Sequence, residues 1–219
     1  MYKACIFDLD GTLTDSVESI AYSANRALQE CGFRPNPIES YKLFAGDGAA
    51  MMLERSLIAA GDTNLKYLEQ VKLKYKEFFI KDCLYQVKPY DGIVTLLKEL
   101  KEKNFKIAVL SNKPHDRAVD VVQTIFGADY FDIILGQTKH IKRKPSPDGA
   151  LIIADELGLL TSECIYIGDT DTDMITGKSA NMFTVGVTWG FRDRHELKEN
   201  NADYIIDSPL QLLEIEEVE

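Results

Sequence analysis

The 219-residue sequence predicts an α/β fold: a doubly wound, mostly parallel sheet with an all-helical domain inserted into it. Three observations support this prediction. Short apolar runs that end in small or polar residues are typical of buried parallel strands, segments with helical spacing lie between these runs, and one long stretch contains only helix-like segments. The composition, with 45% hydrophobic and 27% charged residues, is ordinary for a globular protein.

Six apolar runs have the character of buried strands. They are ACIFDL (4–9), KIAVLS (106–111), DIILG (132–136), CIYIGD (164–169), FTVGV (183–187) and DYIID (203–207). Helical spacing at 114–126 and 146–158 alternates with the middle strands. This alternation is typical of right-handed βαβ units, so we expect a parallel sheet.

The inserted stretch carries helix-like segments at 17–31, 37–44, 48–60 and 64–80. In the first of these, helical spacing puts one set of apolar residues on a single face, namely Val17, Ile20, Ala21, Ala24, Ala27 and Leu28. We therefore expect a discontinuous core of residues 1–15 and 86–219 with a helical cap domain at 16–85, the chain returning at Pro89-Tyr90-Asp91-Gly92. Such a cap could act as a lid that excludes water and selects substrates, or the helices could simply complete the core.

The formal net charge of −10 disfavours nucleic acid and anionic membranes as partners. The opening residues MYKACIFD form too short an apolar run for a signal peptide, and no run approaches the length of a membrane span. We therefore expect a cytoplasmic protein that acts on a small molecule, as a monomer or a homodimer.

The first predicted strand ends in Asp8-Leu9-Asp10-Gly11-Thr12. Positions i and i+2 of a strand share a face, so Asp8 and Asp10 would lie close together and repel each other. A Mg²⁺ ion is the natural counter-charge, and it would leave one carboxylate to attack and the other to handle protons. The alternative is a strand followed by a capped turn.

Three further strand ends or loops carry polar residues. Ser111-Asn112-Lys113 could hold phosphate oxygens, Lys142–Asp148 could supply a lysine that neutralises a transferring phosphoryl group, and Asp169–Asp173 adds a second acidic cluster. Each has an ordinary explanation as a turn, a solvated basic loop or a helix cap. Because ligands bind at the carboxyl ends of strands in open α/β sheets, their combination with Asp8 indicates one site.

At these positions the sequence resembles the haloacid dehalogenase superfamily. The four motifs of that superfamily stand here in order: DLDGT at 8–12, Ser111, Lys144 and GDTDTD at 168–173. The resemblance covers nearly the whole chain, and it implies a Rossmann-like core with a small helical cap inserted after the first motif.

The resemblance also implies the catalytic roles. Asp8 would form a covalent aspartyl-phosphate, and Asp10 would first protonate the leaving group and then activate water. Ser111 and Asn112 would bind the transferring phosphoryl group, while Lys144 would hold Asp8 and the phosphate in register.

The implied cofactor is Mg²⁺. Its ligands would be the Asp8 carboxylate, the Asp10 carbonyl and the Asp169 carboxylate. Asp173 would act behind them by orienting Lys144 or a metal-bound water.

Within the superfamily, the sequence resembles the phosphoglycolate phosphatase-like branch. The resemblance rests on two segments, the cap residues Gly46-Asp47-Gly48 followed by Leu53, Arg55 and Leu57, and the later run GVTWGFR at 186–192. It implies that Gly46, Asp47 and Gly48 contact the substrate, although a Gly-x-Gly loop is also common turn chemistry. We thus expect a phosphatase acting on a small phosphorylated metabolite.

Other functions remain open at this point. Asp10 argues for phosphoryl transfer and against dehalogenation. Rival enzymes are a pyrophosphatase, a nucleotide or sugar-phosphate phosphatase, and a β-phosphoglucomutase, although the histidine usual in the first cap helix of the last is missing from Val17–Cys31. A binding module without turnover is disfavoured by the intact set of motif residues.

Overall fold

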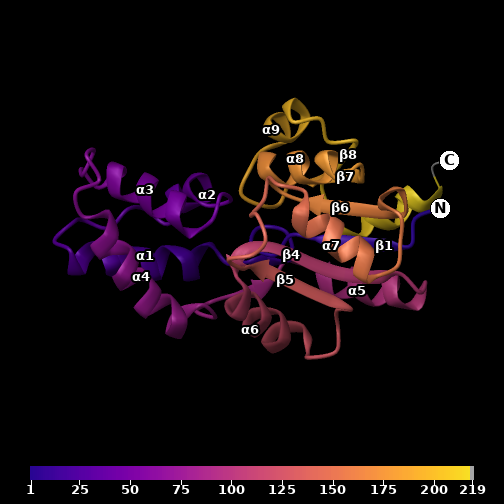
Figure 1. Ribbon diagram of the computed structural model, residues 1–219, viewed down its shortest axis with the longest axis horizontal. Helices are drawn as coiled ribbons and strands as arrows, with labels where there is room; N and C mark the ends of the chain where they lie inside the picture. Colours follow the sequence, from indigo (N-terminus) through magenta and orange to yellow (C-terminus); the bar gives the residue numbers. More distant parts are fainter. Residues whose placement is uncertain (218–219) are drawn as a thin grey trace. The chain divides into compact units, whose positions relative to one another are not determined.

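The computed structural model describes residues 1–217, and these form two compact units (Figure 1). The sheet unit consists of Met1–Thr14 and the chain from Pro89 onward, and the helical unit consists of Asp15–Lys88. The chain passes between the units at two short paired strands, β2 (Thr14–Asp15) and β3 (Lys88–Pro89). These boundaries lie within three residues of those expected from the sequence.

The sheet unit contains a six-stranded parallel sheet in the order β5-β4-β1-β6-β7-β8. The strands are β1 (Ala4–Phe7), β4 (Lys106–Pro114), β5 (Ile133–Gln137), β6 (Cys164–Gly168), β7 (Phe183–Val187) and β8 (Tyr204–Ile206). From β1 the chain builds outward through β4 and β5, and then returns to build the other half from β6. The prediction of a doubly wound parallel sheet is confirmed, and its topological switch point lies at β1, where ligands bind in such sheets.

Helices cover both faces of this sheet. They are α5 (Ile93–Glu102), α6 (His115–Phe126), α7 (Asp148–Glu156), α8 (Asp171–Ser179) and α9 (Arg194–Glu199), with short 3₁₀ segments η1 (Thr161–Glu163) and η2 (Pro209–Glu217). On one face Ile6, Leu110 and Tyr166 pack with Ile153 of α7 and Met182. Because alternate residues of a strand point to opposite faces, the intervening apolar residues of β1, β4 and β6 serve the other face.

The structure departs from the expected elements at the end of β4. This strand continues to Pro114, so Ser111, Asn112 and Lys113 are extended strand residues and not a turn. The pairing of β4 with β5 changes register between Leu110 and Pro114, which lets the strand continue along a shifted path. The side chains of these three residues are buried.

Helix α8 was not expected from apolar spacing, and neither were α5 and α9. The sequence of α8, DTDMITGKS, has little apolar periodicity. Its start is set instead by a capping box, in which Thr170 Oγ1 accepts from the N–H of Asp173 and the Asp173 carboxylate accepts from the N–H of Thr170. The interpretation of this acidic cluster as a helix cap is therefore correct for Asp173.

The helical unit contains α1 (Val17–Glu30), α2 (Ser40–Phe44), α3 (Ala49–Ala59) and α4 (Leu68–Asp82), which confirms the four expected helices. The apolar face predicted for α1 is buried, and α1 packs mainly against α4. A polar cluster also ties the helices together: Tyr41 Oη donates to Asn25 Oδ1 at 2.8 Å, and Asn36 Nδ2 donates to the Ser56 carbonyl at 2.9 Å.

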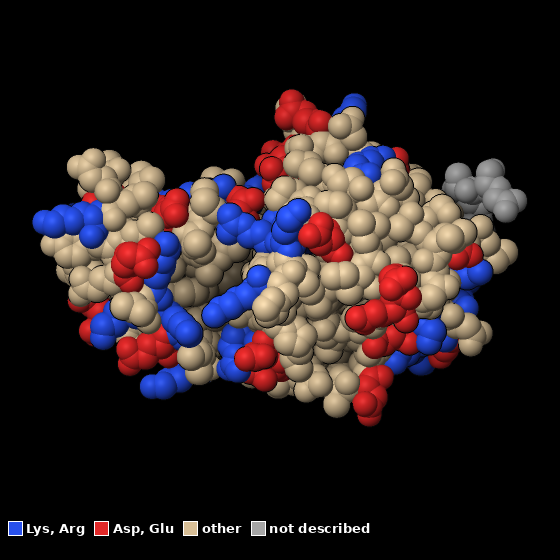
Figure 2. All heavy atoms as spheres, in the orientation of Figure 1, with Lys and Arg blue, Asp and Glu red and all other residues tan. Residues whose placement is uncertain are grey.

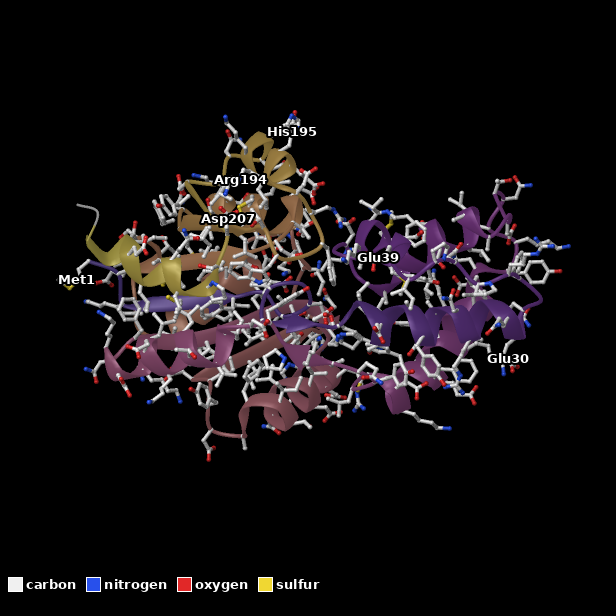
Figure 3. The ribbon with its side chains drawn as sticks, turned by 180° about the vertical axis from the view of Figure 1, so that it is seen from behind. Met1, Glu30, Glu39, Arg194, His195 and Asp207 are labelled. Carbon is white, nitrogen blue, oxygen red and sulfur yellow. The ribbon has the colours of Figure 1, made fainter. Side chains whose placement is uncertain are left out.

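Acidic and basic side chains are interspersed on the face shown in Figure 2. One surface ion pair joins α9 to the residue that follows β8. Arg194 Nη2 lies 2.7 Å from both carboxylate oxygens of Asp207 (Figure 3). Among the described residues, no helix combines the length and the apolar character that crossing a membrane requires.

Candidate active site

Five of the expected site residues meet at the carboxyl ends of the central strands. Asp8 and Asp10 follow β1, Ser111 lies near the end of β4, and Asp169 follows β6. Lys144 comes from the loop before α7. Most of these residues are almost inaccessible to solvent, with 7% of Asp8, 4% of Ser111, 4% of Lys144 and none of Asp169 exposed.

Lys144 is the centre of the charge arrangement. Its Nζ lies 2.7 Å from Asp8 Oδ1, 2.7 Å from Asp173 Oδ1 and 3.2 Å from the Leu110 carbonyl. An ammonium group has three protons, so these three acceptors match its donors. Lys144 therefore holds the Asp8 carboxylate in a defined position, and Asp173 in turn holds Lys144.

The backbone of Lys144 is fixed as well. Its N–H donates to Asn112 Oδ1 at 2.9 Å, and Asn112 Nδ2 donates to the Lys144 carbonyl at 3.1 Å. This reciprocal pair joins the loop to the end of β4. The side-chain amide of Asn112 is thus directed at Lys144, so phosphate binding by Asn112, which remains a prediction, would have to use its backbone N–H.

Asp173 and Asp8 sit in a region with excess negative charge. Burial, and the neighbouring Asp173 and Asp169, raise the pKa of Asp8 well above its ordinary value, although Lys144 acts in the opposite direction. Burial alone would lower the pKa of Lys144, but Asp173 and Asp8 outweigh it and raise that pKa well above its ordinary value. The contacts with Asp8 and Asp173 therefore favour the charged form of Lys144.

Asp169 is held by two distant segments of the chain, one that contains Thr12 and a loop that contains Phe191. Thr12 Oγ1 donates to its Oδ1 at 2.9 Å, and the Phe191 N–H donates to its Oδ2 at 2.7 Å. A Cβ atom at Gly190 would lie only 2.4 Å from Asp169 Cβ and 2.4 Å from the Gly11 carbonyl, so this close approach requires glycine. Burial, with a further contribution from Asp173, raises the pKa of Asp169 to about 7.

A second buried ion pair lies beside the first, and its lysine was expected only as part of the Ser111-Asn112-Lys113 segment, with no role of its own. Lys113 Nζ lies 2.6 Å from Asp10 Oδ1 and 2.9 Å from Asp10 Oδ2. The lysine side chain is 2% exposed and that of Asp10 is 17% exposed. The signal that could have found it is its place two residues after Ser111, directly beyond the strand expected at 106–111.

Comparison with known proteins gives the family. A family model described as haloacid dehalogenase-like hydrolase matches residues 5–187. The chain belongs to the haloacid dehalogenase-like hydrolase family. Among curated relatives, this hydrolase is 32% identical to a phosphoglycolate phosphatase from Haemophilus influenzae, with 98% of each chain covered. It is also 31% identical to one from Neisseria meningitidis, covering 97% of this chain and 92% of that one.

Solved structures agree with these relationships. A candidate phosphoglycolate phosphatase from Lactobacillus delbrueckii subsp. bulgaricus has a TM-score of 0.90 and 31% identity over 98% of each chain. A predicted phosphatase from Clostridium acetobutylicum has a TM-score of 0.86 and 30% identity over the whole of both chains. The predictions of this family, its phosphoglycolate phosphatase-like branch and a phosphoric monoester hydrolase are confirmed at this level.

The donor set of this hydrolase fits a divalent cation. Carboxylate oxygens of Asp8, Asp169 and Asp173 lie within 4.8 Å of one another, and oxygen is the ligand type that Mg²⁺ prefers. Asp173 binds Lys144 through Oδ1 and Thr170 through Oδ2, so it has structural work beside any metal contact, and the assignment of Asp8 and Asp169 as ligands stays a prediction. These three aspartates and Asp10 lie beside two lysines, Lys113 and Lys144. With all four carboxyl groups ionised, the negative charge would exceed the positive charge by two, which a divalent ion would neutralise.

The remaining expected residues belong to the helical unit. Gly46, Asp47 and Gly48 form the loop between α2 and α3, and both glycines have positive φ angles, 114° and 84°. Arg55 of α3 stabilises this loop by donating to the Phe44 carbonyl at 2.9 Å and by pairing with Asp47. The loop is therefore ordered within its own unit, and a role in substrate binding stays a prediction.

Proposed function

We propose that this hydrolase cleaves a small phosphate monoester by Mg²⁺-dependent transfer of the phosphoryl group to Asp8. The observation that carries the proposal is the 2.7 Å contact between Lys144 Nζ and Asp8 Oδ1 at the carboxyl edge of the sheet, with Asp10 and Ser111 at the same edge. A buried carboxylate whose orientation is fixed by a cation is well placed for in-line attack on phosphorus.

The reaction consists of two displacements at phosphorus. In the first, an Asp8 oxygen forms a bond to phosphorus, the bond from phosphorus to the leaving oxygen breaks, and Asp10 gives its proton to that oxygen. In the second, water attacks phosphorus, Asp10 takes a proton from the water, and the bond to Asp8 breaks. Inorganic phosphate leaves, and both aspartates return to their starting states.

The charges of the phosphoryl group need stabilisation in both steps. Lys144 contacts Asp8 and would neutralise charge that develops on the phosphoryl oxygens. The Ser111 hydroxyl and the backbone N–H near Asn112 would bind the same oxygens. Asp8, Asp169 and the Asp10 carbonyl would hold Mg²⁺, which when bound supplies electrostatic stabilisation of the phosphoryl oxygens.

The substrate is proposed to be of the phosphoglycolate type, a short phosphorylated carboxylic acid. Support comes from relatives named phosphoglycolate phosphatase that match this chain over nearly their whole length. The helical unit would act as the cap that selects the leaving group, with Gly46, Asp47 and Gly48 as its substrate-binding residues. The observation against β-phosphoglucomutase is that α1, Val17–Glu30, contains no histidine.

A substrate panel tests this proposal. Phosphate release is measured from 2-phosphoglycolate, pyrophosphate, nucleoside monophosphates and glucose 1-phosphates, with Mg²⁺, with EDTA, and after Mg²⁺ is added back. We expect 2-phosphoglycolate to give the highest kcat/KM and EDTA to abolish turnover reversibly. Preference for another member of the panel would overturn the substrate, and isomerised sugar phosphate without phosphate release would overturn hydrolysis.

Variants test the nucleophile independently of the substrate. Asp8→Asn should remove turnover of every substrate in the panel, because the amide is a poor nucleophile. Asp155→Asn is the matched control, since Asp155 is an exposed aspartate on α7. Near-native activity of Asp8→Asn would show that Asp8 is not the nucleophile.

A further inference from the structure

Lys113 makes a specific contact with Asp10, and the mechanism above gives it no role. Its Nζ reaches both oxygens of the carboxylate, at 2.6 and 2.9 Å, and its side chain is only 2% exposed. A buried ammonium is costly unless it is paired, because it loses its hydration. The chain thus places a second cation at the site with Asp10 as a direct partner.

The two lysines contact different carboxylates. Lys144 contacts Asp8 and Asp173, whereas Lys113 contacts Asp10. They also come from different segments, one from the loop before α7 and the other from the extended end of β4. Each lysine therefore serves one proposed role: Lys144 contacts the nucleophile Asp8, and Lys113 contacts the proton-transfer group Asp10.

Lys113 contacts the proposed phosphate-binding residue as well. Its backbone N–H donates to Ser111 Oγ at 3.2 Å, while its side-chain Nζ donates to the Asp10 carboxylate. A single residue therefore fixes the hydroxyl that would bind the phosphoryl group relative to the carboxyl that would serve the leaving oxygen. The backbone at Lys113 lies close to Gly136 of β5. A Cβ atom at Gly136 would come within 2.8 Å of the Lys113 carbonyl, so the position of Lys113 depends on this glycine.

We propose that Lys113 is the positioning residue for Asp10. By binding both oxygens it limits rotation of the carboxyl group, so that Asp10 is aimed at the leaving oxygen in the first displacement and at water in the second. Lys113 itself neither gains nor loses a proton in either step. An ionised carboxylate has about four lone-pair positions, and a protonated carboxyl group still has acceptor positions beside its O–H donor, so Asp10 can keep a contact with Lys113 while it engages the reactants.

This inference rests on the proposed function and adds a residue to it. It predicts a dependence on the leaving group. An alkoxide must receive a proton as it departs, whereas p-nitrophenolate leaves readily without one, so misplacing the proton donor harms only the first kind of substrate. A merely structural role for Lys113 would affect both kinds alike.

The experiment compares kcat/KM of Lys113→Met with 2-phosphoglycolate and with p-nitrophenyl phosphate. This parameter covers steps up to departure of the leaving group, so the second displacement does not enter. We expect a loss of about 100-fold with 2-phosphoglycolate, carried by kcat and not by KM, and of no more than about 3-fold with p-nitrophenyl phosphate. Lys113→Arg, which keeps the charge, should recover part of the lost activity.

Two further variants calibrate the result. Asp10→Asn gives the largest difference between the two substrates in the loss of kcat/KM, because it removes the proton donor itself. Lys198→Met, at an exposed lysine of α9, is the matched control and should behave as wild type. Equal losses with both substrates would overturn the positioning role and leave the proposed function standing, since that depends on Asp8→Asn. If Lys113→Met does not fold, Lys113→Arg is judged alone, and an equal loss with both substrates again overturns the inference.

Discussion

Lys144 binds Asp8 and Asp173 at the same time, with its Nζ 2.7 Å from one carboxylate oxygen of each. Asp173 also belongs to the capping box that starts α8, and its Oδ2 accepts from Thr170 Oγ1 at 2.7 Å. The start of a helix is thereby connected to the position of Asp8. Local secondary structure and the site depend on the same carboxylate.

Replacing Lys144 should remove activity and reduce stability. Lys144→Met leaves Asp8 and Asp173 buried without their cation, and breaking a buried ion pair from one side costs about 3–5 kcal/mol of unfolding free energy. We expect kcat to fall by at least about 100-fold, as for the loss of one group that stabilises transition-state charge. Steady-state kinetics and urea unfolding measure the two effects.

The neighbouring Lys142→Met is the control for this change. Lys142 lies in the same loop but is exposed, so both quantities should stay near the wild-type values. If Lys144→Met kept activity close to that of Lys142→Met, Lys144 would have no part in phosphoryl transfer.

Binding of Mg²⁺ should depend on pH through Asp169. Burial and the nearby Asp173 raise the pKa of Asp169 to about 7, above the value of about 4 in an unfolded chain. Between these values the folded chain binds more protons than the unfolded one, so without a cation its stability falls as the pH rises through this window. Mg²⁺ competes with that proton, and the gain in Tm on adding it should be larger at about pH 8 than at about pH 5.5.

Asp169→Asn provides the comparison for the pH experiment. The amide does not titrate and carries no charge, so the variant should show a smaller Mg²⁺-dependent gain in Tm and a smaller difference between the two pH values than the wild type, with the remaining difference due to Asp8, whose pKa is also raised. A gain in the wild type that does not change with pH would contradict the assignment of Asp169 as a metal ligand.

The Gly190 position should be sensitive to a single methyl group. The Cβ atom of Gly190→Ala would collide with Asp169 and with the Gly11 carbonyl, both at 2.4 Å, and would displace the Phe191 N–H that binds Asp169. Groups that orient metal ligands typically contribute 10–100-fold in affinity, so we expect the Mg²⁺ concentration for half-maximal activity to rise by about that factor.

Gly186→Ala is the milder comparison for the Gly190 change. Its Cβ would meet Leu197 at 3.1 Å, a tight contact with one side chain and not with the site. An unchanged Mg²⁺ requirement in Gly190→Ala would mean that this loop does not position Asp169.

Much of the architecture could be predicted because the sheet is buried on both faces. The strands are continuous apolar runs, and Asp8, Ser111 and Asp169 stand where three of them end. In a parallel sheet these ends meet at one edge, so sequence alone could bring those residues together.

The parts that were missed depend on geometry that has no local pattern. Lys113 reaches Asp10 only because β4 continues past Ser111 through a change of register. The donor from Phe191 is a backbone N–H, which every residue except proline possesses. Helix α8 starts at a cap and lacks the apolar spacing that reveals a helix.

We expect Asp8 to become phosphorylated during turnover. The direct test uses Asp10→Asn with p-nitrophenyl phosphate, a substrate whose leaving group needs no proton, quenched in acid and digested with pepsin while still acidic. Because the variant activates water poorly, we expect one phosphoryl group on Asp8, in a peptide that contains Asp8 and not Ser111, in amounts that match the burst of p-nitrophenolate. Release of p-nitrophenolate with no phosphoryl group on that peptide, or with the group on Ser111, would contradict it.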